Sequence, residues 1–246
     1  MIAWDWAVGG AVAGLIIGSF LGALTYRWPL GRSIAAGRSQ CDHCGAGIAA
    51  RDLMPVLSFA LLRGRCRHCG GAIAPRHLAV ELAAGMIGGL AIGVHPGAVG
   101  LAGAGFGWIL LALAVLDVEH FWLPDRLTLP LGLAGLFAGI WLAPPLADRV
   151  IGAIAGFVVL AGTAAGYKAL TGRTGMGGGD PRLLAAIGAW LGWAVLPIVI
   201  LLAAILGVAL AGYDRWQGRD VGRHSRSPFG ALLAAAAWPL WLVAPL

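Results

Sequence analysis

Long apolar runs separated by short polar segments dominate this chain. Continuous apolar stretches of this kind, without the spacing of an amphipathic helix, are typical of helices surrounded by lipid. A helix needs roughly 20 apolar residues to cross a hydrocarbon core about 30 Å thick. The candidate runs cover residues 7–26, 79–95, 98–116, 127–143, 150–167, 183–196, 197–213 and 229–245. The pattern predicts an all-α polytopic membrane protein with about eight transmembrane helices.

One polar segment interrupts this pattern between the first and the second run. We therefore expect three parts: a first transmembrane helix in residues 1–26, a polar insert in residues 27–78, and a transmembrane core in residues 79–246. The start of the chain, Trp4-Asp5-Trp6, lacks the positive charge of a signal peptide. The first run is also long enough to span, so we expect it to stay as a transmembrane helix.

Composition and charge support a membrane protein. The chain is 59% hydrophobic and 11% charged, and it has 40 glycines, which allow transmembrane helices to approach closely. The net charge of +6 would suit nucleic-acid binding. The basic residues lie, however, in short loops between apolar runs, so we expect membrane lipid and no nucleic acid as surroundings.

The basic residues also predict the orientation, because cytoplasmic loops are rich in lysine and arginine. The insert alone holds eight arginines, which places it in the cytoplasm. If residues 183–213 form two helices divided near Trp193, 16 of the 17 basic residues lie inside and only Arg149 lies outside. We expect a multi-pass membrane protein whose insert lies on the cytoplasmic side.

The insert holds all four cysteines of the chain as two C-x-x-C pairs, Cys41 with Cys44 and Cys66 with Cys69. Two such turns can supply four thiolates in the tetrahedron that zinc prefers. A redox dithiol is the alternative, although disulfides are rare in a reducing compartment. The insert is too small for a hydrophobic core of its own, so the pattern predicts a structural zinc ion in its place.

Two carboxylates stand at the edges of apolar runs. Asp117 ends one run, and Asp180 follows Gly177-Gly178-Gly179 and opens another, on the same side of the membrane in the predicted topology. Acidic residues at such positions are costly and suggest function. A close pair of carboxylates can share a proton and activate water for peptide hydrolysis, while the glycines admit an extended substrate backbone.

Other interpretations of these residues stay open at this point. The glycines could form only a flexible loop, and Asp180 could merely cap the helix that begins at Pro181. Asp125 competes with Asp117, although a position before a predicted span also suits a capping residue. An ion-binding transporter site is a further alternative, but such sites usually lie near the middle of the membrane.

Several motifs, in order, resemble the type IV prepilin leader peptidases, which are membrane aspartyl proteases of the GxGD type. The similarity covers nearly the whole chain. The matching segments are Gly18-Ser19-Phe20-Leu21, Tyr26-Arg27-Trp28-Pro29, Pro55-Val56-Leu57-Ser58-Phe59, residues 62–70, Glu81, Leu116-Asp117, Leu123-Pro124-Asp125, Leu127-Thr128-Leu129-Pro130, Gly177-Gly178-Gly179-Asp180, residues 183–188 and Pro228-Phe229-Gly230.

The resemblance implies that Asp117 and Asp180 are the catalytic pair. It also implies prepilin or type II secretion pseudopilin substrates, which are cut after a glycine on the cytoplasmic side, and N-methylation of the new amino terminus with S-adenosylmethionine. The chain departs from the family at Gly22, where the opening motif has asparagine, which leaves methyl transfer open. Arg182 replaces the usual lysine and keeps the charge. A non-catalytic, zinc-dependent scaffold of pilus or secretion assembly is the alternative function.

Overall fold

The computed structural model describes residues 2–33, 39–41, 43–219 and 227–243. Within these residues the regular structure is helical, apart from two isolated antiparallel bridges in the insert. Three of the 16 basic residues predicted to lie inside, Arg38, Arg223 and Arg226, lie outside the described residues. The chain divides into two compact units, Met1–Ala112 and Leu113–Leu246, and each is considered by itself.

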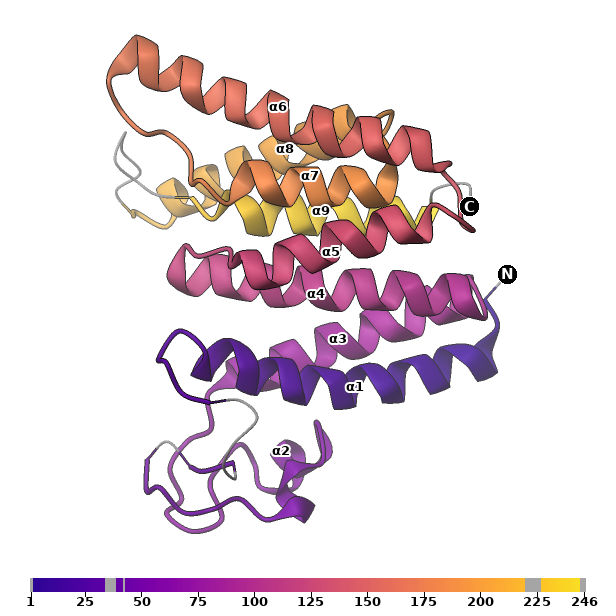
Figure 1. Cartoon of the computed structure of the whole chain (residues 1–246). Helices are drawn as coiled ribbons and strands as arrows, with labels where there is room; N and C mark the ends of the chain where they lie inside the picture. The colour runs from indigo at the N-terminus through magenta and orange to yellow at the C-terminus, as the bar shows by residue number, and fades with distance from the viewer. Residues whose placement is uncertain (1, 34–38, 42, 220–226, 244–246) are drawn as a thin grey trace. The chain divides into compact units, whose positions relative to one another are not determined.

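The first unit is built on the close packing of α1 (Trp4–Arg27) against α3 (Pro75–Val94), with the start of α4 (Ala98–His120) beside them (Figure 1). Gly10, Gly14 and Gly18 of α1 recur every four residues and therefore share one helical face. A Cβ atom on Gly10 or Gly14 would overlap backbone atoms of α3. The small residues thus let the two backbones touch, as is typical of transmembrane helix pairs.

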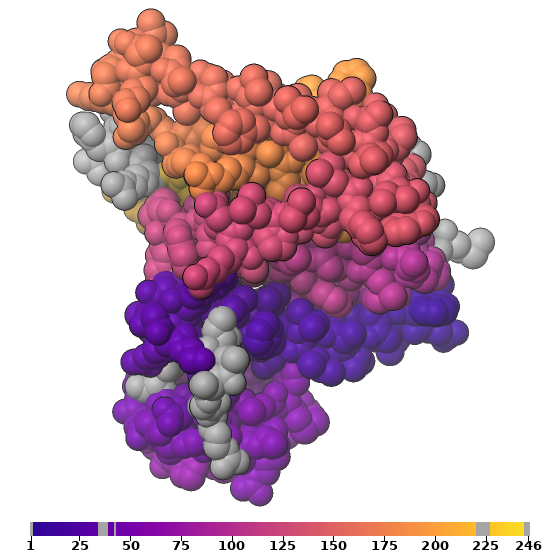
Figure 2. Space-filling view, in the orientation of Figure 1, coloured from indigo at the N-terminus to yellow at the C-terminus, as the bar shows by residue number. Residues whose placement is uncertain are grey.

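The second unit surrounds the short helix α7 (Asp180–Leu191), most of whose residues are buried. Helix α7 contacts α5 (Asp125–Ala138), α6 (Leu146–Thr171), α8 (Leu196–Trp216) and α9 (Phe229–Val243). Gly152 and Gly188 face each other where α6 meets α7, and a Cβ on either glycine would overlap the backbone of the other helix. Helix α6 forms an outer edge of this unit (Figure 2).

The eight predicted runs each correspond to one described helix. Five of these helices, α1, α3, α4, α6 and α8, are long and apolar enough to cross a membrane, whereas α5, α7 and α9 have 14, 12 and 15 residues. The predicted division of residues 183–213 is also present, because α7 ends at Leu191 and α8 begins at Leu196. The prediction of an all-helical membrane protein is confirmed.

Arg149 was expected as the lone basic residue of an outer loop, yet its side chain is buried in the second unit. Its guanidinium group donates hydrogen bonds to the carbonyl oxygens of Ala143 at 2.7 Å, Pro144 at 2.8 Å, Gly135 at 2.9 Å and Ala189 at 3.2 Å. Because the carbonyl groups at the C-terminal end of a helix carry partial negative charge, this one cation stabilises the ends of both α5 and α7.

The insert contains a 3-10 turn, Ala50–Leu53, the short helix α2 (Leu57–Leu61), and two similar knuckles. Each knuckle is closed by one bridge, Gln40 with Gly47 and Arg65 with Ala72. The two knuckles share the sequence pattern C-x-H-C-G-x-x-I, beginning at Cys41 and at Cys66. The insert is therefore a small internal repeat, and its two halves meet at the cysteines.

Candidate active site and metal centre

Asp117 lies near the end of α4, and its side chain is buried, with 6% of its surface exposed. Its Oδ2 atom accepts a hydrogen bond of 2.9 Å from the backbone N–H of Ala231, in the first turn of α9. The first amides of a helix have no partner within the helix and attract negative charge. The start of α9 thus provides a donor for this carboxylate.

Asp180 is the first residue of α7 and is buried to the same degree, with 6% exposed. Its Oδ2 accepts a hydrogen bond of 3.1 Å from the backbone N–H of Gly177, so the carboxylate folds back onto the glycine segment before the helix. The N-cap position of α7 belongs to Gly179. Asp180 therefore does not act as the cap of its own helix, which was one of the open interpretations.

Leu123, in the loop between α4 and α5, connects the surroundings of the two carboxylates. A Cβ atom on Gly179, next to Asp180, would lie 2.7 Å from Cβ of Leu123. A Cβ atom on Gly230 would lie 2.7 Å from Cδ1 of Leu123 and 3.0 Å from Oδ2 of Asp117. The two aspartates therefore meet around one leucine, and Asp117 is close enough to act on Asp180 electrostatically.

The three glycines before α7 differ in their surroundings. A Cβ on Gly177 would meet Oδ2 of Asp180 at 3.3 Å, and one on Gly179 would meet Leu123, whereas Gly178 faces open space. A side chain at Gly177 would thus crowd the Asp180 carboxylate, and a side chain at Gly179 would crowd Leu123. The middle glycine leaves room next to Asp180 that another chain could occupy.

Asp125, the rival of Asp117, has a different environment. Both of its carboxylate oxygens lie 2.7 Å from Nη1 of Arg182, and about half of each side chain is exposed (47% and 48%). An exposed, paired carboxylate is an ordinary surface ion pair. The buried pair is formed by Asp117 and Asp180, and Asp125 links the start of α5 to the start of α7.

The four cysteines of the insert form one cluster, in which all four Sγ atoms lie within 4.8 Å of one another. The Sγ atoms of Cys41 and Cys69 are 3.9 Å apart, close to the ~3.8 Å that zinc–sulfur bonds of about 2.3 Å give in a tetrahedron. All four thiols are free of disulfides. A single cluster drawn from both pairs fits a metal better than two separate dithiols.

Local backbone geometry prepares these thiols for a metal. Gly45 and Gly70 adopt positive φ angles of 68° and 69° and donate their N–H groups to the carbonyls of Cys41 and Cys66. Backbone N–H groups of Cys69 and His68 lower the pKa of the Cys66 thiol to about 6. Since the thiolate is the form that binds zinc, the turn favours the ligand state of Cys66. At Cys69 the Gly71 N–H lowers the pKa, but burial and the neighbouring thiols outweigh it and raise the pKa to about 11.

The two histidines of the pairs stay outside this cluster. The Nε2 atom of His43 lies 3.2 Å from the carbonyl oxygen of Ala72, in the other knuckle, and His68 is exposed. The cluster that could hold a metal ion is thus formed by the four cysteines.

Gly22, the departure from the family motif, is buried in α1 and faces α3. A Cβ atom there would lie 3.1 Å from Nδ1 of His77, so an asparagine would require the imidazole to move. This chain thus has a histidine ring beside the position where the motif has an amide.

The fold and these sites define a class of protein: a polytopic helical membrane protein with two buried aspartates and a cluster of four cysteines that could hold a metal ion. The chain belongs to the type IV leader peptidase family. Residues 104–212 match that family, and residues 12–94 match the bacterial peptidase A24 N-terminal domain. Asp117 and Asp180 both lie within residues 104–212, the region that matches the type IV leader peptidase family.

Similar proteins cover almost all of the chain. Proteins named prepilin leader peptidase/N-methyltransferase are 39% identical in Burkholderia pseudomallei (strain 1026b), 38% in Aeromonas hydrophila and 37% in Pseudomonas putida. These matches cover 91%, 91% and 92% of this chain and 81%, 86% and 87% of the relatives. No solved structure shows a significant match to the chain.

Proposed function

We propose that this protein is an aspartic endopeptidase that removes the basic leader of type IV prepilins or type II secretion pseudopilins after a glycine. The observation that carries the proposal is the pair of buried carboxylates, Asp117 and Asp180, each held by a backbone N–H in a chain of this family. The names of the relatives support the substrate class.

The two aspartates would divide the chemistry of hydrolysis. Two neighbouring buried carboxylates cannot both carry a charge at low cost, so one keeps a proton. The ionised carboxylate takes a proton from a water molecule as that water attacks the peptide carbon, and the protonated one donates to the carbonyl oxygen. As the peptide C–N bond breaks, the proton taken from water passes to the leaving amine. A hydroxyl of the tetrahedral intermediate returns its proton to the other aspartate, which frees the mature amino terminus and restores the pair.

The donors to the two carboxylates assign them a fixed geometry in this reaction. The Ala231 amide and the Gly177 amide each occupy one oxygen, Oδ2 of Asp117 and Oδ2 of Asp180. The other oxygen of each carboxylate is then the one that faces water and substrate. The glycines Gly177, Gly178 and Gly179 would let the extended substrate backbone pass close to Asp180.

The insert would keep its structure through a zinc ion held by Cys41, Cys44, Cys66 and Cys69. The mutual distances of the four sulfur atoms support this assignment. The site has four protein ligands and no open position for a substrate, so we propose a structural rather than a catalytic role.

We further propose that the freed amino terminus is N-methylated with S-adenosylmethionine, the activity that the names of the relatives include. When bound, S-adenosylmethionine would supply the methyl group. The enzyme would act in the bacterial inner membrane, with the aspartates and the insert on the cytoplasmic side, as the arginine distribution predicts.

One experiment tests both activities. The purified protein in lipid is incubated with a prepilin, with and without S-adenosylmethionine, and the products are weighed by mass spectrometry. We expect loss of the leader mass in both reactions and an added methyl group only with the donor. An unchanged prepilin would contradict the peptidase, and leader loss without a methyl group would contradict only the transferase.

A further inference from the structure

The insert carries an apolar surface that its small size does not explain. The side chains of Leu53, Met54, Leu57 and Leu61, in and beside α2, are all exposed, and Leu61 reaches 74%. Exposure of these apolar side chains to water is unfavourable, and neighbouring exposed apolar side chains mark a contact surface. We call this set, residues 53–61, the apolar segment.

The backbone of the apolar segment is held in a strained shape. Val56 adopts a φ angle of 60° and Arg63 one of 51°, so both ends of α2 are flanked by residues in the left-handed region. Positive φ is rare for a β-branched residue such as valine. Strain of this kind persists only where the surroundings enforce it, and it is common at functional surfaces.

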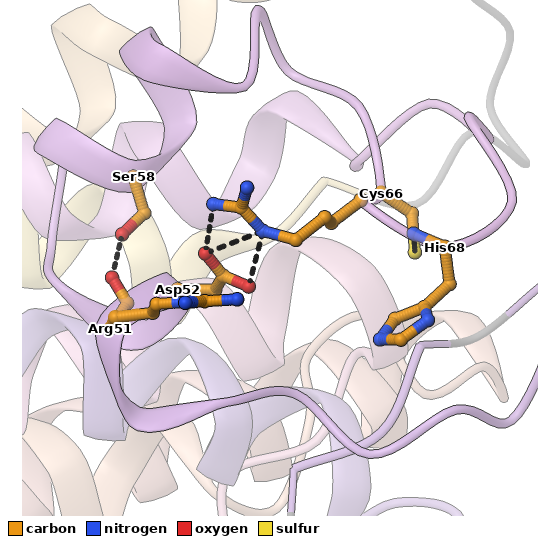
Figure 3. Close-up of polar contacts among 6 residues, drawn as sticks. Arg51, Asp52, Ser58, Cys66 and His68 are labelled. Atoms are coloured by element: carbon orange, nitrogen blue, oxygen red, sulfur yellow. Dashed lines mark hydrogen bonds and ion pairs between the residues drawn. The ribbon is translucent and has the colours of Figure 1, made fainter.

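Two contacts enforce the shape. The backbone N–H of Val56 donates a 2.7 Å hydrogen bond to Oε2 of Glu81, on α3. In the second contact, Arg67 of the second cysteine knuckle binds both carboxylate oxygens of Asp52, with a shortest distance of 2.6 Å (Figure 3). Next to it, Ser58 Oγ donates a hydrogen bond to the carbonyl oxygen of Arg51. The apolar segment is therefore fixed between the metal centre and a transmembrane helix.

The contact with Glu81 places the apolar segment at membrane depth. The apolar run of α3 begins at residue 79, and Glu81 lies two residues, about 3 Å, after that point. The Val56 amide that binds Glu81 therefore lies near the boundary of the hydrocarbon core. Figure 1 likewise shows α2 beside the α1–α3 pair rather than beyond its end.

Several backbone N–H groups in and after the apolar segment have a partner within the protein, as contact with lipid requires. Besides Val56, the amides of Leu57, Ser58, Ala60 and Leu62 donate to carbonyls of the same segment. The amides of Arg63, Gly64 and Arg65 do the same at its end. Local pairing of this kind lowers the cost of placing the segment in contact with lipid.

Exposed arginines flank the apolar side chains: Arg51 before them, and Arg63 and Arg65 after them. Arginine at the membrane surface buries its aliphatic stem and reaches lipid phosphates with its guanidinium group. Apolar side chains with a basic border are complementary to the boundary between headgroups and acyl chains, and this complementarity identifies the occupant of the surface as lipid.

We propose that the apolar segment lies in the headgroup–acyl boundary of the leaflet on the side of the insert, with Leu57 and Leu61 among the acyl chains. The insert is then a membrane-attached element rather than a free cytoplasmic domain. Its zinc centre braces the apolar segment through Arg67 and Asp52, and Glu81 fixes the depth.

Fluorescence quenching tests this placement in the full-length, zinc-loaded protein. A polarity-sensitive fluorophore is attached to Leu57→Cys, to Leu61→Cys and, as a matched control in the second knuckle, to the exposed Ala72→Cys. Labelling of the wild-type chain, whose own cysteines are protected by zinc, gives the background. The proteins are placed in vesicles of phosphatidylcholine and phosphatidylglycerol that carry a quencher on the acyl chain.

We expect a blue-shifted emission at positions 57 and 61 and loss of most of it to the quencher, with little change at position 72. Glu81→Ala, which removes the acceptor for Val56 but keeps the zinc ligands, should reduce the quenching at position 57. Equal quenching at all three positions would overturn the proposal. So would emission at position 57 that ignores the lipid quencher and responds only to added prepilin, because the occupant would then be the substrate.

Discussion

The position of the Asp117 carboxylate depends on the absence of a side chain at residue 230, and Gly230→Ala tests this dependence. The added Cβ atom would lie 3.0 Å from Oδ2 of Asp117, which is closer than an ordinary contact. Asp117 would have to retreat by a few tenths of an ångström, away from the Ala231 amide that now binds it at 2.9 Å.

The size of the effect follows from that hydrogen bond. A hydrogen bond to a charged group contributes about 1.5–3 kcal/mol, and each 1.36 kcal/mol corresponds to about a tenfold change in rate. We therefore expect kcat/KM for leader cleavage to fall about 10- to 100-fold if the bond is lost. Alanine is a better helix former than glycine, so the thermal stability should not fall in parallel.

The assay follows leader release from a prepilin by purified protein in lipid, and the melting temperature is measured on the same samples. Gly212→Ala in α8 is the matched control, because a Cβ atom there meets nothing within 4 Å. Wild-type activity in Gly230→Ala, or an equal loss in Gly212→Ala, would refute the reasoning.

Leu123 also stands 2.7 Å from the added Cβ atom, and a double variant separates its effect from that of Asp117. Leu123→Ala shortens the leucine and leaves the contact with Asp117 in place. Leu123→Ala combined with Gly230→Ala should therefore remain less active than Leu123→Ala alone. Equal activity of the two would show that the leucine, and not the carboxylate, had been displaced.

Three further predictions concern the metal, the pH dependence and the packing. Cys66→Ser removes one of four clustered thiols, and we expect loss of bound zinc by elemental analysis and proteolysis confined to the insert; zinc retained at the wild-type level would contradict the metal site. The Arg67 hydrogen bond lowers the pKa of Asp52 in the folded protein. The stabilisation of the insert by this ion pair is therefore present above the unfolded pKa of the carboxyl group and is lost as the pH falls through the lower folded value. The protection of the insert from proteolysis should fall less steeply with acid in Asp52→Asn, and an identical acid titration would argue against this role. Gly152→Leu, whose side chain would enter the backbone of α7, should lower thermal stability by several degrees or prevent folding, whereas Gly162→Leu on the same helix faces open space and should be tolerated; equal melting temperatures would exclude close packing at Gly152.

Apolar patterning was sufficient for the helices because transmembrane segments form their backbone hydrogen bonds locally. The division between α7 and α8, where Gly192 adopts a φ angle of 74°, was instead predicted from the distribution of basic residues. The apolar pattern could not predict that Arg149 is buried. Its hydrogen-bond acceptors are backbone carbonyl oxygens, which every residue type has, so the sequence does not identify them.

Residue types likewise indicated the two aspartates and the four cysteines but not their supports. Asp117 binds the amide of Ala231, 114 positions further along the chain, and any residue but proline could supply that N–H. Leu123 stood in a recognised motif beside Asp125, yet its contacts with Gly179 and Gly230 arise only from packing. The knuckle repeat, by contrast, was present in the sequence and could have been found by aligning the two halves of the insert.

The most direct test of the account is the rate of leader release by three isosteric variants, Asp117→Asn, Asp180→Asn and Asp125→Asn, each purified in lipid with its melting temperature recorded. Asparagine keeps the shape of the side chain but cannot exchange a proton with water or with the peptide. We predict no detectable cleavage by the first two variants and near wild-type cleavage by the third, whose carboxylate forms only an exposed ion pair. Cleavage at the wild-type rate by a folded Asp117→Asn or Asp180→Asn variant would contradict the proposed catalytic pair.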